Sequence, residues 1–266
     1  MDNRAIGVFD SGLGGLTAAK VLEELLPQEN IIYFGDSGRM PYGGRSVEEL
    51  RRIAVEDAGF VGSFGVKAML IACGTMSGCA MEALRENYST PFFSVENAAC
   101  NAVVAATVNK RVGVIATAGS IRSGMFERGI KRRDSGIQVI AKACPSLAAL
   151  VEQGHFRPGD AVAEAAVREE LSVFEGSGID TLLLGCTHYP LLSEIIAGYL
   201  GEELRQISCG AETARELAAY LKDNDMLAVR GGEGRRRWFT SGDTALFASG
   251  ASLFLGHAIE VERHIL

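Results

Sequence analysis

Two cysteines stand in matching positions at the ends of two apolar segments. MLIACGT (69–75) places Cys73 after one apolar run, and TLLLGCTHYP (181–190) places Cys186 after another. Such runs predict buried strands that end at a turn, the edge at which open α/β folds bind their ligands. A single free cysteine is most often a buried small hydrophobe. The matched pair instead favours two related α/β halves that each present one thiol to a shared cleft.

The residues beside Cys186 add further proton-transfer groups. Thr187 and His188 follow it directly, so a thiol, a hydroxyl and an imidazole share one predicted turn. The pKa of a free cysteine thiol is about 8.5, so a thiol acts as a base only with help. That help comes from a nearby cation, a helix N-terminus or a neighbouring base. This turn therefore predicts acid–base chemistry.

The elements that must hold these turns alternate along the chain. Short β runs at 6–9, 31–35 and 112–116 alternate with amphipathic helices such as the one predicted over 160–175. This alternation predicts an α/β fold. A chain of 266 residues allows two domains or one large one.

Glycine-rich turns follow several of these strands. DSGLGG (10–15) and TAGSIRS (117–123) each lead from a strand into a helix, where backbone N–H groups attract anions. DSGLGG is neither a Walker loop nor G-x-G-x-x-G, so a carboxylate suits it as well as a nucleotide. Asp10 either caps the helix or takes part in the chemistry. The loop at 36–44 crowds Asp, Arg, Pro and Tyr beside glycines, which is typical of functional loops.

Composition and charge exclude several function classes. The net charge of −7 gives no general attraction for nucleic acid, and we expect the basic run RGGEGRRR (230–237) to be a solvated loop. Six cysteines without a CxxC pair argue against a zinc ribbon and against a thioredoxin-like motif. The sequence has no signal peptide and no membrane-length apolar run, so we expect a cytoplasmic protein with reduced thiols and no membrane partner.

The motifs FDSGLGGL, FGDSGRMPYG, IACGT, GVIAT, LLLGCTHYP and FTSGD, in this order and spacing, resemble the glutamate racemases over nearly the whole chain. The resemblance implies two similar doubly wound α/β domains related by a pseudo-two-fold axis, with the active site in the cleft between them. The first domain would comprise residues 1–97 plus 212–266 and the second residues 98–211.

The resemblance also implies a function. The protein would interconvert L- and D-glutamate without a metal or organic cofactor, supply D-glutamate for peptidoglycan, and form a homodimer. Two thiols suit this reaction because one removes the α-proton from one face while the other delivers a proton to the opposite face. The implied catalytic residues are Cys73 assisted by Asp10, and Cys186 assisted by His188 and Glu152. The implied substrate-binding residues are Asp10, Ser11, Asp36, Pro41, Tyr42, Gly43, Gly74, Thr75, Thr117, Ser120, Thr187 and His188.

The chain departs from the family pattern at two positions. Gly74 stands where most members have asparagine, and the missing amide contact would cost about 1.5–3 kcal/mol unless another group replaces it. Asn97 replaces a usual proline, which we expect to be a structural change only. Because the chain begins shortly before IGVFD, we expect it to lack the N-terminal extension that binds an activator in some members. Two alternatives stay open: a racemase or isomerase of aspartate or another small acid, and a non-catalytic amino-acid-binding protein.

Overall fold

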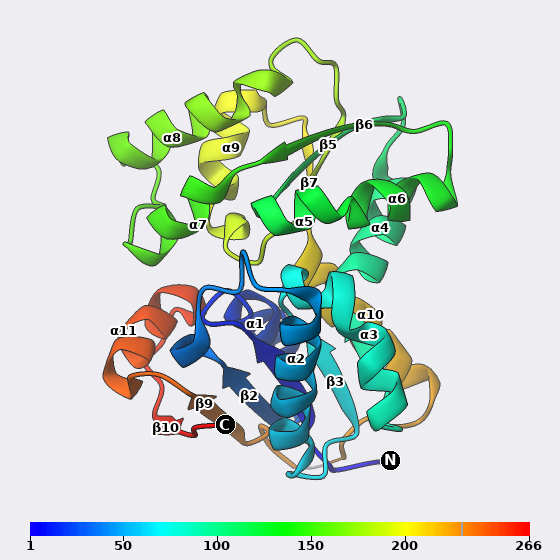
Figure 1. The fold of residues 1–266 in the computed structure, drawn as a ribbon, viewed down its shortest axis with the longest axis vertical. Coiled ribbons are helices and arrows are strands. Elements are labelled where there is room, and N and C mark those ends of the chain that lie inside the picture. Colours follow the sequence, from blue (N-terminus) through cyan, green and yellow to red (C-terminus); the bar gives the residue numbers. More distant parts are fainter. Residues whose placement is uncertain (230) are drawn as a thin grey trace.

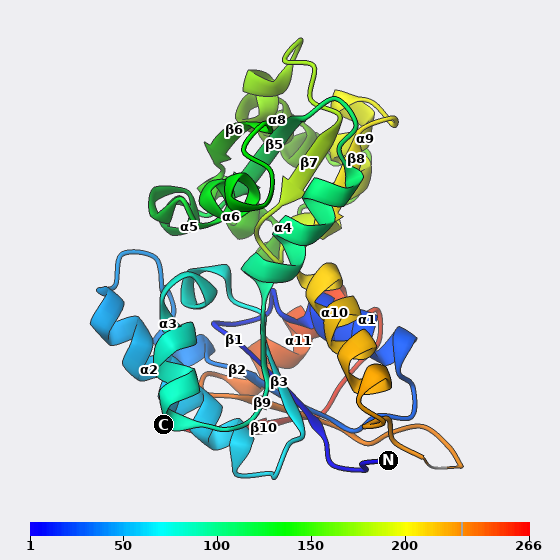
Figure 2. The ribbon, with the colours of Figure 1, turned by 90° about the vertical axis from the view of Figure 1, so that its right-hand side faces the viewer.

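The protein, described by a computed structural model over residues 1–229 and 231–266, contains two parallel β-sheets flanked by helices (Figures 1 and 2). The first sheet has the strand order β10-β9-β2-β1-β3-β4 and the second has the order β6-β5-β7-β8. All the strand pairs are parallel, with Ile6 of β1 opposite both Ile31 of β2 and Ala68 of β3. The predicted α/β class is confirmed.

The strands of the first sheet come from both ends of the chain. They are β1 (Ile6–Asp10), β2 (Ile31–Gly35), β3 (Ala68–Ile71), β4 (Phe92–Ser94), β9 (Arg236–Thr240) and β10 (Val261–Arg263). The second sheet lies between them in sequence and comprises β5 (Arg111–Ala116), β6 (Gln138–Ala143), β7 (Thr181–Leu184) and β8 (Arg205–Ser208). β1, β3 and β7 are buried along their whole length, which is why their sequences read as nearly continuous apolar runs. The domain boundaries at 97/98 and 211/212 fall inside connecting helices and stay a prediction.

Helices cover both sheets. Those connecting or following strands of the first sheet are α1 (Leu16–Leu25), α2 (Val47–Gly62), α3 (Gly74–Asn87), α10 (Cys209–Asp223) and α11 (Thr244–Leu255), with the 3-10 turn η1 (Ser37–Arg39). Those of the second are α4 (Val95–Ala106), α5 (Ala118–Ser123), α6 (Met125–Arg133), α7 (Pro145–Glu152), α8 (Ala161–Leu171) and α9 (Ser193–Leu200), with the 3-10 turns η2 (Ser172–Phe174) and η3 (Tyr189–Leu192). Helix α10 packs against both α1 and α4, so it ties the two sheets together.

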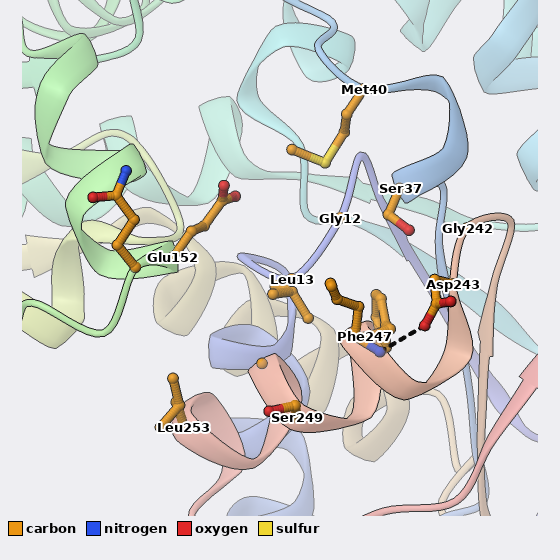
Figure 3. Close-up of a pocket in the computed structure, with 13 residues that line it drawn as sticks. Gly12, Leu13, Ser37, Met40, Glu152, Gly242, Asp243, Phe247, Ser249 and Leu253 are labelled. Atoms are coloured by element: carbon orange, nitrogen blue, oxygen red, sulfur yellow. Dashed lines mark hydrogen bonds between the residues drawn. The ribbon is translucent and has the colours of Figure 1, made fainter.

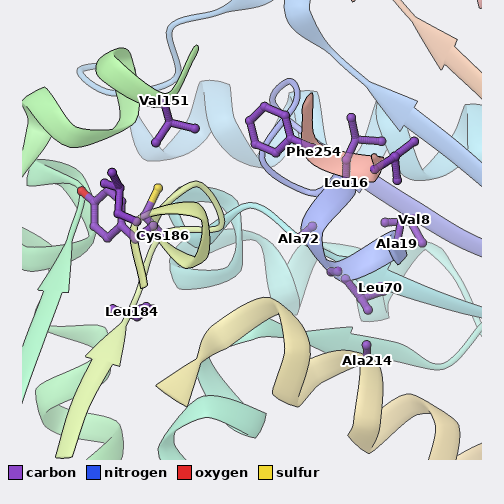
Figure 4. Close-up of a cluster of buried hydrophobic side chains, with 14 of the residues drawn as sticks. Val8, Leu16, Ala19, Leu70, Ala72, Val151, Leu184, Cys186, Ala214 and Phe254 are labelled. Atoms are coloured by element: carbon purple, nitrogen blue, oxygen red, sulfur yellow. The ribbon is translucent and has the colours of Figure 1, made fainter. Parts of the chain in front are cut away.

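One hydrophobic cluster extends across both sheets (Figure 4). It includes Val8 and Leu70 of the first sheet and Leu184 of the second, with Val151 of α7 and Cys186. The backbone around Cys186 is thereby fixed by close packing, which is what a precisely placed reactive group requires.

The C-terminal elements correct the sequence analysis. The expected solvated loop is wrong for Arg236 and Arg237, which belong to β9; Arg230 lies outside the described residues. Arg236 pairs with Glu23 and Glu233, while Arg237 pairs with Glu262 at 2.8 Å and lies over the rings of Phe64 and Phe239. These partners explain how a basic segment forms a strand. Among the described residues no helix is long and apolar enough to span a bilayer.

Candidate active site

Cys73 and Cys186 line one cavity of about 230 Å³ between the two sheets. The cavity is formed where β1, β3, β5 and β7 end, because the residues directly after these strands line it. Cys73 is the N-cap residue of α3, and Cys186 lies in the turn between β7 and η3. The prediction that two strand-end turns present two thiols to one cleft agrees with this geometry.

The cavity gathers nearly all the predicted site residues. Those lining it are Asp10, Ser11, Pro41, Tyr42, Gly43, Cys73, Gly74, Thr75, Thr117, Ser120, Glu152, Cys186, Thr187 and His188. Four further residues that were not predicted also line it: Met40, Ala148, Ala149 and Gly185. The two alanines lie three and four positions before Glu152 on α7, so helical spacing from Glu152 was the signal that identifies them.

Asp36 does not line this cavity, although it was predicted to bind the substrate. Its fully buried carboxylate accepts hydrogen bonds from the Tyr42 hydroxyl, from Arg39 Nε at 2.6 Å and from Ser241 Oγ at 2.6 Å. Asp36 therefore lies behind Tyr42, and the structure gives it a positioning role in the loop. Arg39 also donates a hydrogen bond to Asp57 at 2.6 Å, and no local pattern points to Asp57 because it lies inside α2.

The Cys73 thiol is held in a buried position beside a carboxylate. Burial and the charge of Asp10 raise the pKa of Cys73 to about 12, although hydrogen bonds from the Met76 N–H, the Ser11 hydroxyl and the Thr75 N–H act in the opposite direction. Cys73 is therefore a neutral thiol, ready to donate a proton. A cation placed beside it would favour the thiolate.

Asp10 fixes the turn that enters α1 and also lines the cavity. Its Oδ2 accepts hydrogen bonds from the N–H groups of Gly15 at 2.8 Å and Gly12 at 3.3 Å. A Cβ atom on Gly14 would lie 2.3 Å from the Thr187 hydroxyl, so only glycine lets this turn approach the turn that carries Cys186. The two roles considered for Asp10, capping the helix and taking part in the chemistry, are thus compatible.

Cys186 forms a relay with His188 and Glu152. The Cys186 sulfur lies 3.7 Å from His188 Nδ1, and His188 Nε2 lies 2.9 Å from Glu152 Oε1. Burial disfavours the imidazolium, but the contacts with Cys186 and Glu152 outweigh it and raise the pKa of His188 to about 10. The edge of the ring packs against Phe254, with centroids 5.5 Å apart. His188 is thus oriented to exchange a proton with the Cys186 sulfur.

Hydroxyl groups from the second sheet complete the cavity. Thr117 caps α5 by accepting a hydrogen bond from the Ser120 N–H at 3.3 Å, and its hydroxyl lies 3.1 Å from the Ser120 hydroxyl. Across the cleft, the Thr17 hydroxyl donates to the Thr187 carbonyl at 2.9 Å. The predicted use of the Thr117 turn as an anion cradle stays a prediction.

A larger cavity of about 540 Å³ adjoins this one (Figure 3). Met40 and Glu152 line both cavities, whereas Leu13, Phe247 and Leu253 give the larger one apolar walls. None of its described lining residues is a cysteine or a histidine. The acid–base groups thus mark the smaller cavity as the candidate active site. Within the part of the chain that the structure describes, no cluster of three or more His, Cys, Asp or Glu side chains is placed to hold a metal ion.

Comparison with known proteins shows what the chain resembles. It matches the Asp/Glu/Hydantoin racemase family over residues 16–217. It is 41% identical to the glutamate racemase of Geobacter metallireducens over 253 residues, which cover 95% of this chain and 93% of that protein. The crystal structure of a glutamate racemase isoform from Bacillus anthracis matches with a TM-score of 0.93 and 39% identity, covering 100% of this chain and 99% of that one. The glutamate racemase of Francisella tularensis in complex with D-glutamate matches with a TM-score of 0.89 and 34% identity, covering 100% and 98%.

Proposed function

The chain belongs to the Asp/Glu/hydantoin racemase family and is an amino-acid racemase of the glutamate racemase group. From this premise we propose that it interconverts L- and D-glutamate by a two-thiol mechanism. The proposal rests on one observation: Cys73 and Cys186 follow strands of different sheets but line the same cavity. A carbon held between the two sulfurs would be accessible to acid–base groups on both faces, as inversion requires.

In the proposed reaction His188 holds the proton shared with Cys186 and Glu152 holds the ring in place, so Cys186 acts as a thiolate beside an imidazolium. The Cys186 thiolate removes the α-proton, so a C–H bond breaks and an S–H bond forms. The neutral Cys73 thiol then gives its proton to the opposite face of the carbanion, which leaves a thiolate on Cys73. The reverse direction uses the same groups with their roles exchanged.

The proposed substrate contacts also help the chemistry. The hydroxyls and backbone N–H groups at the turns of Ser11, Thr75, Thr117 and Thr187 would hold the two carboxylates and stabilise the charge that develops during proton removal. The substrate ammonium beside Asp10 would lower the electrostatic cost of a thiolate on Cys73. A Francisella tularensis relative in complex with D-glutamate and an Escherichia coli relative in complex with L-glutamate support glutamate as the ligand.

The wider role follows from the product. In this proposal the D-glutamate is supplied for peptidoglycan synthesis, and the enzyme acts as a homodimer in the cytoplasm without a metal or organic cofactor. The predicted domains, residues 1–97 plus 212–266 and residues 98–211, would close on the substrate between them.

The direct test is to incubate the purified protein with L- or D-glutamate and follow optical rotation, with loss of the α-proton NMR signal in D₂O as a second readout. The proposal expects both enantiomers to approach the same racemic mixture. Parallel incubations with aspartate address the first alternative: turnover of aspartate but not of glutamate would assign that substrate. Binding of glutamate by calorimetry without any change in rotation would instead support the non-catalytic alternative.

A further inference from the structure

The turn that carries Cys186 contains one carbonyl that cannot be hydrogen-bonded locally. The carbonyls of Cys186 and His188 each accept the N–H of the residue three positions further on, at 3.1 and 3.2 Å. The carbonyl of Thr187, between them, would need the N–H of Pro190, and proline has none. Because Thr187 is buried, its carbonyl needs a donor from elsewhere in the chain.

The donor comes from the first half of the molecule. The Thr17 hydroxyl on α1 lies 2.9 Å from the Thr187 carbonyl. The same hydroxyl also lies 2.9 Å from the Gly14 carbonyl, but that carbonyl already accepts the Thr17 N–H at 3.1 Å. A hydroxyl has one proton to donate. The Thr187 carbonyl, which receives no other hydrogen bond from the described residues, is therefore the acceptor that needs it.

Close packing encloses this hydrogen bond on two sides. A Cβ atom on Gly14 would lie 2.6 Å from His188 Nδ1, so the turn rests directly on the start of α1. On the other side, a Cβ atom on Gly210 of α10 would lie 3.4 Å from Thr187 Cγ2 and 3.6 Å from Thr17 Oγ1. The Thr17 hydroxyl thus lies at a tight contact between the two halves of the molecule.

The place of α1 in the chain gives this contact a consequence for the thiols. Helix α1 follows the turn of Asp10, whose charge acts on Cys73. Thr17 therefore joins the turn beside one thiol to the turn that carries the other, Cys186. Thr17 does not itself line the cavity that holds the thiols.

We propose that Thr17 is a positioning residue for racemisation, whose hydrogen bond to the Thr187 carbonyl sets the separation of the two thiols. The proposal rests on the racemase function proposed above, because the separation matters only if both thiols act on one carbon. Thr17 acts through the turn and not on the substrate. Positioning of this kind has large effects, since a misplacement of about 1 Å can slow a reaction about 100-fold.

The test removes the hydroxyl and keeps the shape of the side chain. In Thr17→Val we expect kcat for glutamate to fall about 10- to 100-fold, because the Cys186 turn is no longer held in place. KM should stay within about threefold of the wild-type value, because no group that lines the cavity is removed. Thr17→Ala, with a residue that favours the helix, should show the same loss. Thr17→Ser keeps the hydroxyl and should restore a kcat close to that of the wild-type protein.

Thr213→Val is the matched control. Thr213 is fully buried on α10, its hydroxyl donates to the Cys209 carbonyl at 2.7 Å, and it does not line the cavity. This variant also loses a buried threonine hydroxyl, but no hydrogen bond to the Cys186 turn. It should change neither kcat nor KM, and circular dichroism checks that every variant is folded.

Several results would overturn the inference. A wild-type kcat in Thr17→Val would reject it while leaving the proposed function intact. A raised KM with an unchanged kcat, a Thr17→Ser variant as slow as Thr17→Val, or an equal loss in Thr213→Val would also reject it. Wild-type protein that does not racemise glutamate would reject the proposed function and this inference with it.

Discussion

His188 Nε2 lies 2.9 Å from Glu152 Oε1, so a side chain from the turn after β7 is held by one from the end of α7. The other ring nitrogen is thereby turned toward Cys186. Glu152 also lines the larger apolar cavity, so the same carboxylate borders both spaces. The orientation of the proposed general base therefore depends on a residue that need not touch the reacting carbon.

This contact predicts a pH-dependent stability. The folded-state pKa of His188 is raised from 6.5 to about 10, so protonated His188 stabilises the folded protein. This contribution to the free energy of unfolding is fully present below about pH 6.5 and is lost as pH rises through 10. Glu152→Gln should thus lower the free energy of unfolding by about 1–2 kcal/mol near pH 6.5, with a smaller loss at pH 10. Urea titrations at several pH values measure this. The exposed Glu169→Gln on α8 is the control, and a loss for Glu152→Gln that does not vary with pH would contradict the assignment.

The two-thiol mechanism predicts that each cysteine is individually essential. Cys73→Ser and Cys186→Ser should each lower kcat for racemisation by about 10³-fold, because a hydroxyl is a far weaker acid than a thiol. Both variants should keep the wild-type circular dichroism spectrum, since the change in volume is small. Cys100→Ser, at a buried cysteine that bonds the Phe126 carbonyl away from the site, should retain activity. Near-normal turnover by either site variant would remove the mechanism.

Asp10 should control the reactivity of Cys73. Its negative charge is one cause of the raised pKa of Cys73, after burial. Asp10→Asn removes the charge and keeps an oxygen for the Gly15 N–H, so alkylation of Cys73 by iodoacetamide at pH 8 should speed up about threefold or more. Racemisation should fall, because the proposed partner of the substrate ammonium is lost. Peptide mass spectrometry with Cys79 as the internal reference measures the rate, and slower alkylation of Cys73 would oppose this role.

Much of the candidate site could be predicted from the sequence, because its residues lie in turns with strong local signals. The apolar runs before Cys73 and Cys186 define buried parallel strands, and parallel strands bring their carboxyl ends to one edge. Ser46 at the start of α2 is another local signal, because serine is a preferred N-cap residue and its hydroxyl accepts the Glu49 N–H at 3.2 Å. In contrast, no local signal placed Asp36 behind Tyr42, since that arrangement depends on the tertiary contacts of the loop.

The C-terminal part of the fold was harder to predict. Strand β9 begins with two arginines, Arg236 and Arg237, which made it look like a loop, although the next residues, Trp238 and Phe239, are only 5% and 4% exposed. The strand is stable because its arginines form ion pairs with residues from distant segments of the chain. These partners cannot be recognised from the local sequence. The sequence likewise placed Gly74 in the site without showing that a Cβ there would lie 3.3 Å from the Ser120 hydroxyl and from the Gly185 carbonyl, because these contacts join distant segments.

The network behind Tyr42 predicts a large effect from one arginine. Arg39 bonds Asp36 and Asp57, both fully buried, each at 2.6 Å. Arg39→Gln leaves these carboxylates without their cation and should destabilise the fold by about 3 kcal/mol, and KM for glutamate should rise as the Tyr42 loop loosens. Arg52→Gln removes an exposed pair with Glu56 and should cost no more than about 0.5 kcal/mol. Equal losses in the two variants, measured by urea unfolding, would show that the network does not hold the loop.

Racemisation in D₂O should place deuterium in the product enantiomer well before it appears in the remaining substrate. The thiol on the product side has exchanged with solvent before the reaction, so each inversion delivers deuterium. The sulfur on the substrate side holds the proton it has just removed, and in a cleft shielded from water that proton returns to the same face if the intermediate reverts. A single base moving between faces would instead carry the original hydrogen across. Mass spectrometry of the separated enantiomers at low conversion decides between them: substantial protium in the product would refute the placement of Cys73 and Cys186 on opposite faces.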